Sequence, residues 1–153
     1  MQIKEAKPVN FLFFRTETKI SGLVNFLPVA KELFKETVKL DLWVTGPVHW
    51  HYYGFAGDET KPFTLEIALP VATLPEQYDG KFHLKRTEPF RCVSVVHEGD
   101  WYEIPNAYGK IMEFVSSNGL VPIGVNRELY INADFSHPEA NVTEIQMGVA
   151  AAS

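Results

Sequence analysis

Two stretches of sequence decide the fold, FTLEIALPV (residues 63–71) and VTEIQMGV (residues 142–149). Both are rich in β-branched and large apolar residues, a composition typical of buried strands. Each contains a Glu-Ile pair, and the glutamates Glu66 and Glu144 are 78 residues apart (144 − 66). The same offset carries Gly46 onto Gly124, Tyr52 onto Tyr130 and Val71 onto Val149. This common offset predicts a duplicated unit.

On either side of these stretches, the sequence predicts the same order of elements in each half of the chain: a strand, an amphipathic helix and two further strands. The first half places them at 9–20, about 28–38, 48–55 and 63–71, and the second at 82–97, about 105–118, 124–132 and 142–149. A proline, Pro28 or Pro105, stands at the start of each predicted helix. We therefore predict one α+β domain over residues 1–153, with repeats at about 9–71 and 82–149. An antiparallel sheet with two main helices should hold a central ligand cleft where the halves meet.

Charge and composition exclude several classes of protein. The chain has 14 basic and 19 acidic side chains, a net charge of −5, whereas a binder of phosphate backbones needs a basic face. We therefore expect no direct binding of nucleic acid. No signal peptide is recognisable, and no apolar run approaches the roughly 18 residues of a membrane span. The single cysteine, Cys92, cannot form an internal disulfide, which fits a reducing compartment. We therefore predict a cytoplasmic protein without membrane association, and we expect Cys92 to be a small buried residue.

Several short motifs resemble the GyrI-like family, the effector-binding domains of bacterial multidrug-responsive transcription activators and their stand-alone relatives. They are HEGDWY (97–102), AY (107–108), ELY (128–130) and TEI (143–145), and the likeness extends from about Val9 to Val149. The resemblance implies duplicated units around a cleft that holds aromatic or cationic small molecules without a cofactor. It also maps the ligand-contacting glutamate of the family onto Glu128. We expect no room in this chain for the separate DNA-binding segment of the regulators.

Strand alternation adds neighbours to Glu128. Residues two apart in a strand share a face, so Tyr130 points the same way, and the 78-residue offset adds Trp50 and Tyr52 from the first half. A carboxylate among aromatic rings gives a cation both charge pairing and ring faces. The alternative for Glu128 is a solvated strand residue with no special role.

Two further candidates lie on or beside the second predicted helix. Trp101 and Tyr108 have polar tips that need partners, so we predict that they form pocket walls, with plain packing as the alternative. Glu66 and Glu144 alternate with apolar neighbours, and we expect them to face solvent from the sheet.

A metal site and known catalytic motifs find little support. The pair His49 and His51 places two imidazoles on one strand face, but the next acid, Asp58, lies beyond two glycines and no third histidine follows in metal-binding spacing. No nucleophile elbow, phosphate-binding glycine loop or H-E-x-x-H motif is present. We therefore predict no metal and no cofactor.

Three functions remain open. The leading one is a stand-alone protein that sequesters or senses hydrophobic, cationic or aromatic compounds, in keeping with multidrug binding and transcription regulation in the family. The alternative is a hydrolase of strained or toxic small molecules on the same scaffold, using Glu128 as the cleft glutamate. The third is a module that binds a protein partner, as do relatives that bind DNA gyrase. The sequence does not separate these functions.

Overall fold

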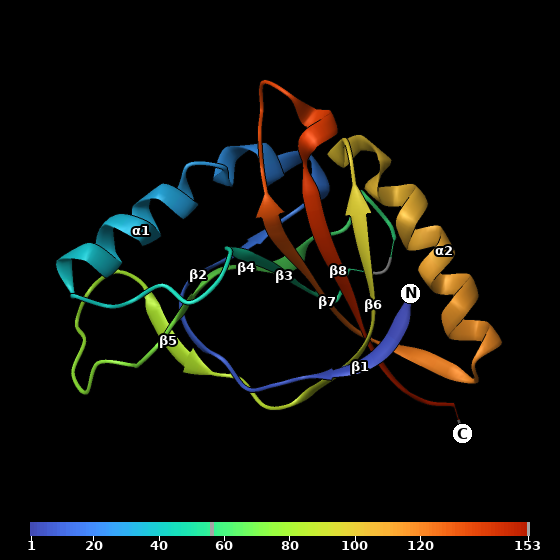
Figure 1. Cartoon of the computed structure of the whole chain (residues 1–153), viewed down its shortest axis with the longest axis horizontal. Coiled ribbons are helices and arrows are strands. Elements are labelled where there is room, and N and C mark those ends of the chain that lie inside the picture. The colour runs from blue at the N-terminus through green and yellow to red at the C-terminus, as the bar shows by residue number, and fades with distance from the viewer. Residues whose placement is uncertain (56, 153) are drawn as a thin grey trace.

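The computed structural model describes residues 1–55 and 57–152, which form one eight-stranded antiparallel sheet with two α-helices (Figure 1). The strands are β1 (Gln2–Ala6), β2 (Asn10–Thr18), β3 (His49–Tyr53), β4 (Phe63–Val71), β5 (His83–Arg86), β6 (Phe90–Glu98), β7 (Leu120–Asn132) and β8 (Val142–Ala151). The helices are α1 (Val29–Lys39) and α2 (Ile104–Ser117), with short 3-10 turns at Ile20–Phe26, Trp101–Glu103 and Pro138–Ala140. The predicted α+β class is confirmed.

The sheet order is β1-β6-β8-β7-β3-β4-β2-β5, so β3 and β7 form its centre. These two strands are antiparallel, and Trp50 lies opposite Glu128. β4 and β8 flank them, followed by β2 and β6. The outermost strands cross between the halves, since β1 pairs with β6 and β5 pairs with β2. We call this arrangement the strand exchange. The sequence did not predict β1, and it assigned residues 82–97 wholly to the second half, although β5 pairs with β2 of the first half.

Local sequence explains where the helices begin and end. Pro28 directly precedes α1, and Pro105 lies in the first turn of α2, where its missing N–H costs no helical hydrogen bond. Asp100 starts the 3-10 turn before α2 by accepting a hydrogen bond from the backbone N–H of Tyr102 at 3.0 Å. α2 ends at Ser117, and Gly119 follows with φ of 66°, a left-handed conformation that suits glycine. The predicted helices are thus confirmed.

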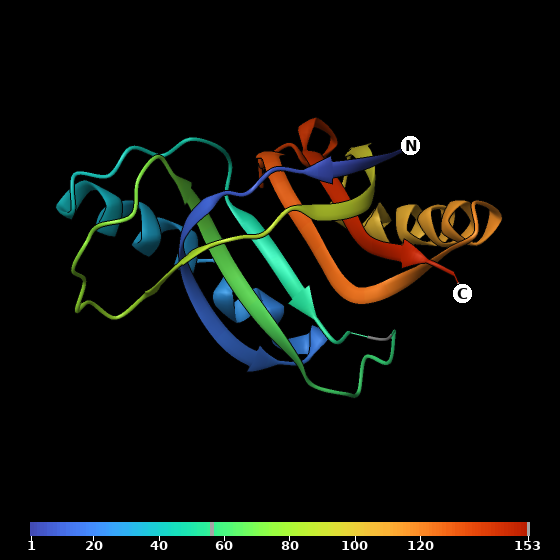
Figure 2. The same ribbon diagram turned by 90° about the horizontal axis from the view of Figure 1, so that it is seen from below.

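Both helices pack on the same face of the sheet and lie at opposite ends of the molecule (Figures 1 and 2). α1 contacts β2 and β4, where Leu33 lies in a core with Leu65 and Ile67. α2 contacts β6 and β7, and its Ile111 lies in a second apolar cluster with Ile145 of β8. The face that carries the helices holds the two main clusters of apolar side chains, and the candidate site lies between them.

The central strand β7 differs from its predicted bounds. It begins at Leu120 instead of Gly124, and its register against β8 shifts between Pro122 and Asn126. Gly124 has φ of 84° within this irregular segment, a conformation that other residues rarely adopt. None of the described helices has the length and apolar composition that a membrane crossing requires.

Candidate functional site

Glu128 lies at the centre of the helix-bearing face and accepts hydrogen bonds from three tyrosines. The hydroxyl of Tyr108 donates to Oε2 at 2.8 Å, and that of Tyr130 donates to Oε1 at 2.7 Å. The hydroxyl of Tyr52 is 3.5 Å from Oε1, a long contact for an O–H donor. The tyrosines come from α2, β7 and β3, so three elements converge on one carboxylate.

Strand alternation accounts for much of this convergence. Tyr130 stands two residues after Glu128 in β7, and Tyr52 stands two residues after Trp50 in β3. Because Trp50 and Glu128 are paired across the two strands, all four side chains share one face. Tyr108 reaches the same carboxylate from α2, which lies against this part of the sheet.

Burial determines the electrostatics of the site. Glu128 is only 7% exposed, and burial raises the pKa of its carboxyl group, while the hydrogen bonds from Tyr130, Tyr108 and Tyr52 act in the opposite direction. Burial and the nearby Glu128 charge together raise the pKa of all three phenols well above the ordinary value. The phenols therefore stay protonated at neutral pH and serve as donors.

Aromatic rings surround the carboxylate and its tyrosines. Tyr130 makes edge contacts with Trp50 and with Trp101, at centroid distances of 6.0 and 5.4 Å. The indole N–H of Trp101 donates to Oγ1 of Thr143 at 3.2 Å, so its polar tip is satisfied. Trp101 also contacts Phe135, which sequence analysis missed because a lone aromatic in a polar loop shows no periodic pattern.

The structure thus brings all the sequence-predicted residues into one contact network: Glu128, Tyr130, Trp50, Tyr52, Trp101 and Tyr108. Among the described residues, no salt bridge includes Glu128. The arrangement presents an uncompensated carboxylate among aromatic rings, which is chemically suited to a hydrophobic cation. Two surface hollows, of about 400 and 290 Å³, are lined by other residues, so an open cleft beside Glu128 stays a prediction.

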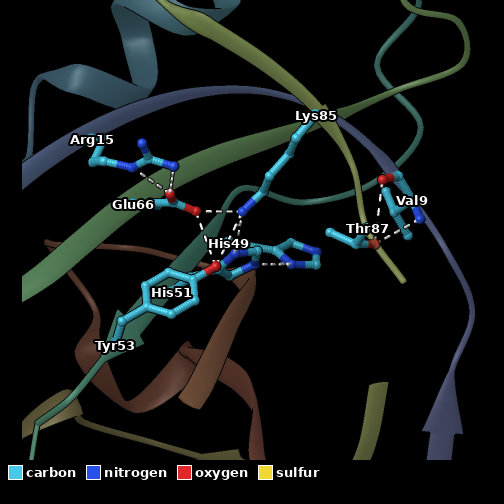
Figure 3. Close-up of polar contacts among 8 residues, drawn as sticks. All are labelled: Val9, Arg15, His49, His51, Tyr53, Glu66, Lys85 and Thr87. Carbon is cyan, nitrogen blue, oxygen red and sulfur yellow. Dashed lines mark hydrogen bonds and ion pairs between the residues drawn. The ribbon is translucent and has the colours of Figure 1, made fainter. Parts of the chain in front are cut away.

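The opposite face of the sheet carries a second polar cluster, which Figure 3 shows. Glu66 is 3% exposed, so the expectation that it faces solvent was wrong. Arg15 donates to its Oε2 at 2.8 Å, Tyr53 donates to its Oε1 at 3.0 Å, and Lys85 forms an ion pair with the same oxygen. Burial alone raises the pKa of Glu66, but these partners, Lys85 above all, hold that pKa below its ordinary value. Alternation predicted the face correctly, but it carried no information on what covers that face.

Next to this cluster, the two histidines of β3 are also buried. Nδ1 of His49 and Nε2 of His51 are 3.1 Å apart, and burial lowers the pKa of His49 to about 3 and that of His51 well below its ordinary value. Both imidazoles are therefore neutral at pH 7. Within residues 1–55 and 57–152, no group of three or more His, Cys, Asp and Glu residues could hold a metal ion. Cys92 is buried, as predicted, and burial raises the pKa of its thiol.

Solved structures with the same fold include EcmrR in two forms. The C-terminal domain of EcmrR matches with a TM-score of 0.81 and 22% identity, over 98% of this chain and 96% of that one. The EcmrR chain in a complex with DNA matches with a TM-score of 0.80 and 22% identity, again over 98% of this chain. The present chain spans 57% of the length of that EcmrR chain. Identities at this level show a common fold.

Two further solved structures and one family profile match the chain. SAV2435 bound to tetraphenylphosphonium matches with a TM-score of 0.65 and 12% identity over 97% of this chain and 93% of that one. A hydrolase from Listeria innocua matches with a TM-score of 0.64 and 16% identity over 97% and 91%. A comparison with curated proteins finds no match. The profile of the GyrI-like small molecule binding domain matches residues 1–150, which is nearly the whole chain. The chain therefore belongs to the family of GyrI-like small molecule binding domains.

Proposed function

We propose that this GyrI-like domain binds hydrophobic cations on the helix-bearing face of the sheet, with Glu128 as the counter-charge. The observation that carries the proposal is a buried carboxylate whose described partners are three neutral phenols and no cation. A buried charge without an opposite charge is costly. A cationic ligand offsets that cost when it binds, whereas a neutral ligand of the same shape does not.

The aromatic neighbours supply the rest of the recognition. Trp50 and Trp101 both contact the ring of Tyr130, so a ligand beside Glu128 would meet indole and phenol surfaces. A desolvated ring over a cation contributes about 2 kcal/mol. SAV2435, which has the same fold, is named as binding tetraphenylphosphonium, a cation with four phenyl groups, and this supports the proposed ligand class.

The test uses two probes of the same shape and opposite charge. Tetraphenylphosphonium and tetraphenylborate should be titrated by calorimetry into the wild-type protein, the variant Glu128→Gln and the control Glu113→Gln, which changes an exposed glutamate on α2. A direct charge contact in a desolvated site contributes about 1–3 kcal/mol, so Glu128→Gln should weaken binding of the phosphonium about 5–150-fold. Glu113→Gln should leave it unchanged. Equal affinity of the wild-type protein for both probes would contradict the proposal, as would an unchanged affinity in Glu128→Gln.

Hydrolysis is the second candidate, because burial raises the pKa of Glu128 and Tyr108 lies within hydrogen-bond distance of it. A carboxyl group with a raised pKa suits general acid–base catalysis, in which Glu128 would accept a proton from an attacking water molecule. A structure of the same fold is named as a hydrolase, which supports testing this alternative. If the protein is a hydrolase of strained or toxic small molecules, Glu128→Gln should abolish turnover and leave substrate binding largely intact.

We further propose that the two halves are copies of one unit. The sheet order reads symmetrically from the β3–β7 pair outward, with β4 matching β8 and β2 matching β6, and Trp50 is paired with Glu128, its counterpart under the 78-residue offset. The proposed cleft then lies on the axis that relates the halves. A cytoplasmic sensor or scavenger of several drug-like cations is consistent with one buried, unpaired cysteine and with a fold shared with EcmrR, whose chain is solved in a complex with DNA.

A further inference from the structure

The larger surface hollow, about 400 Å³, lies on the face of the sheet that carries no helix. Its floor is formed by side chains of the central strands, including Arg127 and Leu129 of β7 and Gln146 of β8. Its walls are formed by residues 4–7 and 9 and by the segment at Thr45 and Gly46. Arg127 and Glu128 are consecutive in a strand, so this hollow and the proposed cation site lie on opposite sides of one sheet.

Hydrogen bonds and an ion pair anchor the N-terminal residues that line the hollow. The backbone N–H of Val9 donates to Oγ1 of Thr87 at 2.9 Å, and the backbone N–H of Thr87 donates to the carbonyl of Val9 at the same distance (Figure 3). Lys4 of β1 forms an ion pair with Glu144 at 2.6 Å. These contacts hold the wall of the hollow in place over the sheet.

Arg127 is the unusual residue of this hollow. It is 6% exposed, and its guanidinium lies 3.9 Å from the centroid of the Phe90 ring. Its Nε has no hydrogen-bond partner in the part of the chain that the structure describes. An arginine stays charged at all ordinary pH values, and its planar guanidinium suits bidentate binding of a carboxylate. The ring of Phe90 fixes the plane of this donor.

The acids near the hollow are occupied by other partners. Glu144 accepts from Lys4, from Oγ of Ser94 at 2.9 Å and from Nε2 of Gln146 at 2.7 Å. Glu66, farther along the same face, is held by Arg15 and Lys85. Glu5, the other acid of the wall, is exposed to solvent. Among the described residues, none of these acids forms an ion pair with Arg127.

Gln146 adds a second free atom beside Arg127, its direct cross-strand neighbour. The amide nitrogen of Gln146 donates to Glu144, which fixes the orientation of the amide. Its Oε1 is buried and has no partner among the described residues. Two cross-strand neighbours therefore each hold a buried polar atom, a donor on Arg127 and an acceptor on Gln146, that is costly to leave unpaired. A water molecule meets both needs for hydrogen bonding but leaves the charge uncompensated.

We propose that this hollow is a second ligand site, for a small carboxylate that also carries a hydroxyl or amine donor. The guanidinium of Arg127 binds the carboxylate, and Oε1 of Gln146 accepts the hydrogen bond from the donor. The neutral imidazole of His49 and the side chain of Leu129 line the same space and limit the size of the ligand. The site is independent of the proposed cation site because its residues point to the other face.

The experiment compares lactate with propionate, which differ by the hydroxyl group that Gln146 should recognise. The full chain, labelled with ¹⁵N, is titrated with each sodium salt at matched ionic strength, and the Arg127 Nε–H resonance is followed. Lactate should move this resonance with a dissociation constant in the millimolar range, which corresponds to about −4 kcal/mol at 1 mM. Propionate should bind about 2–10-fold more weakly, as expected from one lost hydrogen bond. An unmoved Arg127 resonance, or stronger binding of inorganic phosphate than of lactate, would overturn the assignment.

Two variants and one control locate the binding. Arg127→Gln should weaken lactate binding at least tenfold, and Gln146→Leu should remove the preference for lactate over propionate. Arg91→Gln removes the same charge from an exposed position of β6 and should change the affinity less than about twofold. Equal losses in Arg127→Gln and Arg91→Gln would show unspecific charge attraction and refute the site. If Arg127→Gln does not fold, the wild-type titration and the preference of Gln146→Leu still decide the outcome.

Discussion

Replacing Glu128 by glutamine should stabilise the unliganded protein at neutral pH, and the gain should depend on pH. Burial of an ion without a counter-charge costs several kcal/mol, even after local relaxation. Against this cost stand two short hydrogen bonds from Tyr130 and Tyr108, at 2.7 and 2.8 Å. A bond to a charged acceptor exceeds a neutral one by about 1 kcal/mol, so these bonds offset only part of the cost. We expect Glu128→Gln to be more stable by about 1–2 kcal/mol at pH 7.

The sign of the pH dependence follows from the raised pKa of Glu128. Its ordinary pKa is 4.5, and burial raises the value in the folded state, so between these two values the folded protein binds more protons than the unfolded chain. The contribution of Glu128 to stability is therefore fully present below pH 4.5 and is lost as the pH rises through the folded-state pKa. Each pH unit in this window changes the free energy of unfolding by up to about 1.36 kcal/mol. The glutamine variant has no such titration.

Urea unfolding of both proteins between about pH 4 and pH 8, followed by tryptophan fluorescence, measures the difference directly. All other groups titrate in both proteins, so the difference in unfolding free energy isolates Glu128. The gap in favour of Glu128→Gln should open above pH 4.5 and then level off. A gap that is constant with pH would refute the reasoning. A gap that favours the wild-type protein increasingly as pH rises would show that the Glu128 charge is already compensated in the unliganded state.

Two further predictions concern stability in urea at pH 7. Tyr108→Phe removes the 2.8 Å hydrogen bond to buried Glu128 and should lower the free energy of unfolding by about 1–3 kcal/mol. The control Tyr102→Phe changes a side chain that is 91% exposed and should alter the free energy of unfolding by less than about 0.5 kcal/mol. Similar losses in the two variants would contradict the proposed geometry. Gly109→Ala, at an exposed position of α2, should raise the free energy of unfolding by about 0.5–1 kcal/mol. Gly119→Ala, at a residue with φ of 66°, should lower it by about 1–2 kcal/mol. Changes of the same sign would contradict the assigned backbone conformations.

Local patterns in the sequence predicted most of the elements, because their causes are local. Pro28 and Pro105 mark helix starts, and apolar periodicity marks the strands and helices that follow. β1 was missed because its five residues contain few apolar side chains, and only pairing with the distant β6 makes them a strand. The burial of Glu66 was missed for a similar reason, since Lys85 reaches it from β5, a strand that the sequence places in the other half.

The candidate site was likewise predictable only where local patterns determine it. Two-residue alternation and the offset between the halves are enough to place Tyr130, Tyr52 and Trp50 beside Glu128. Alternation cannot say whether the shared face is open, and in the folded protein Glu128 is nearly covered. Phe135 belongs to a loop, where no period relates a side chain to the sheet.

The strand exchange has a consequence for the order in which the protein is made. As the ribosome releases the N-terminal half, β2 has no β5 to cover its outer edge, and β1 has no partner until β6 emerges. At translation rates of about 5–20 residues per second, these edges stay open for seconds. Unpaired strand edges invite association with other chains. We therefore expect the domain to depend most on chaperones while only its N-terminal half has been synthesised. A slow codon between β4 and β5 should lower the soluble yield of the protein more than a slow codon placed after β6.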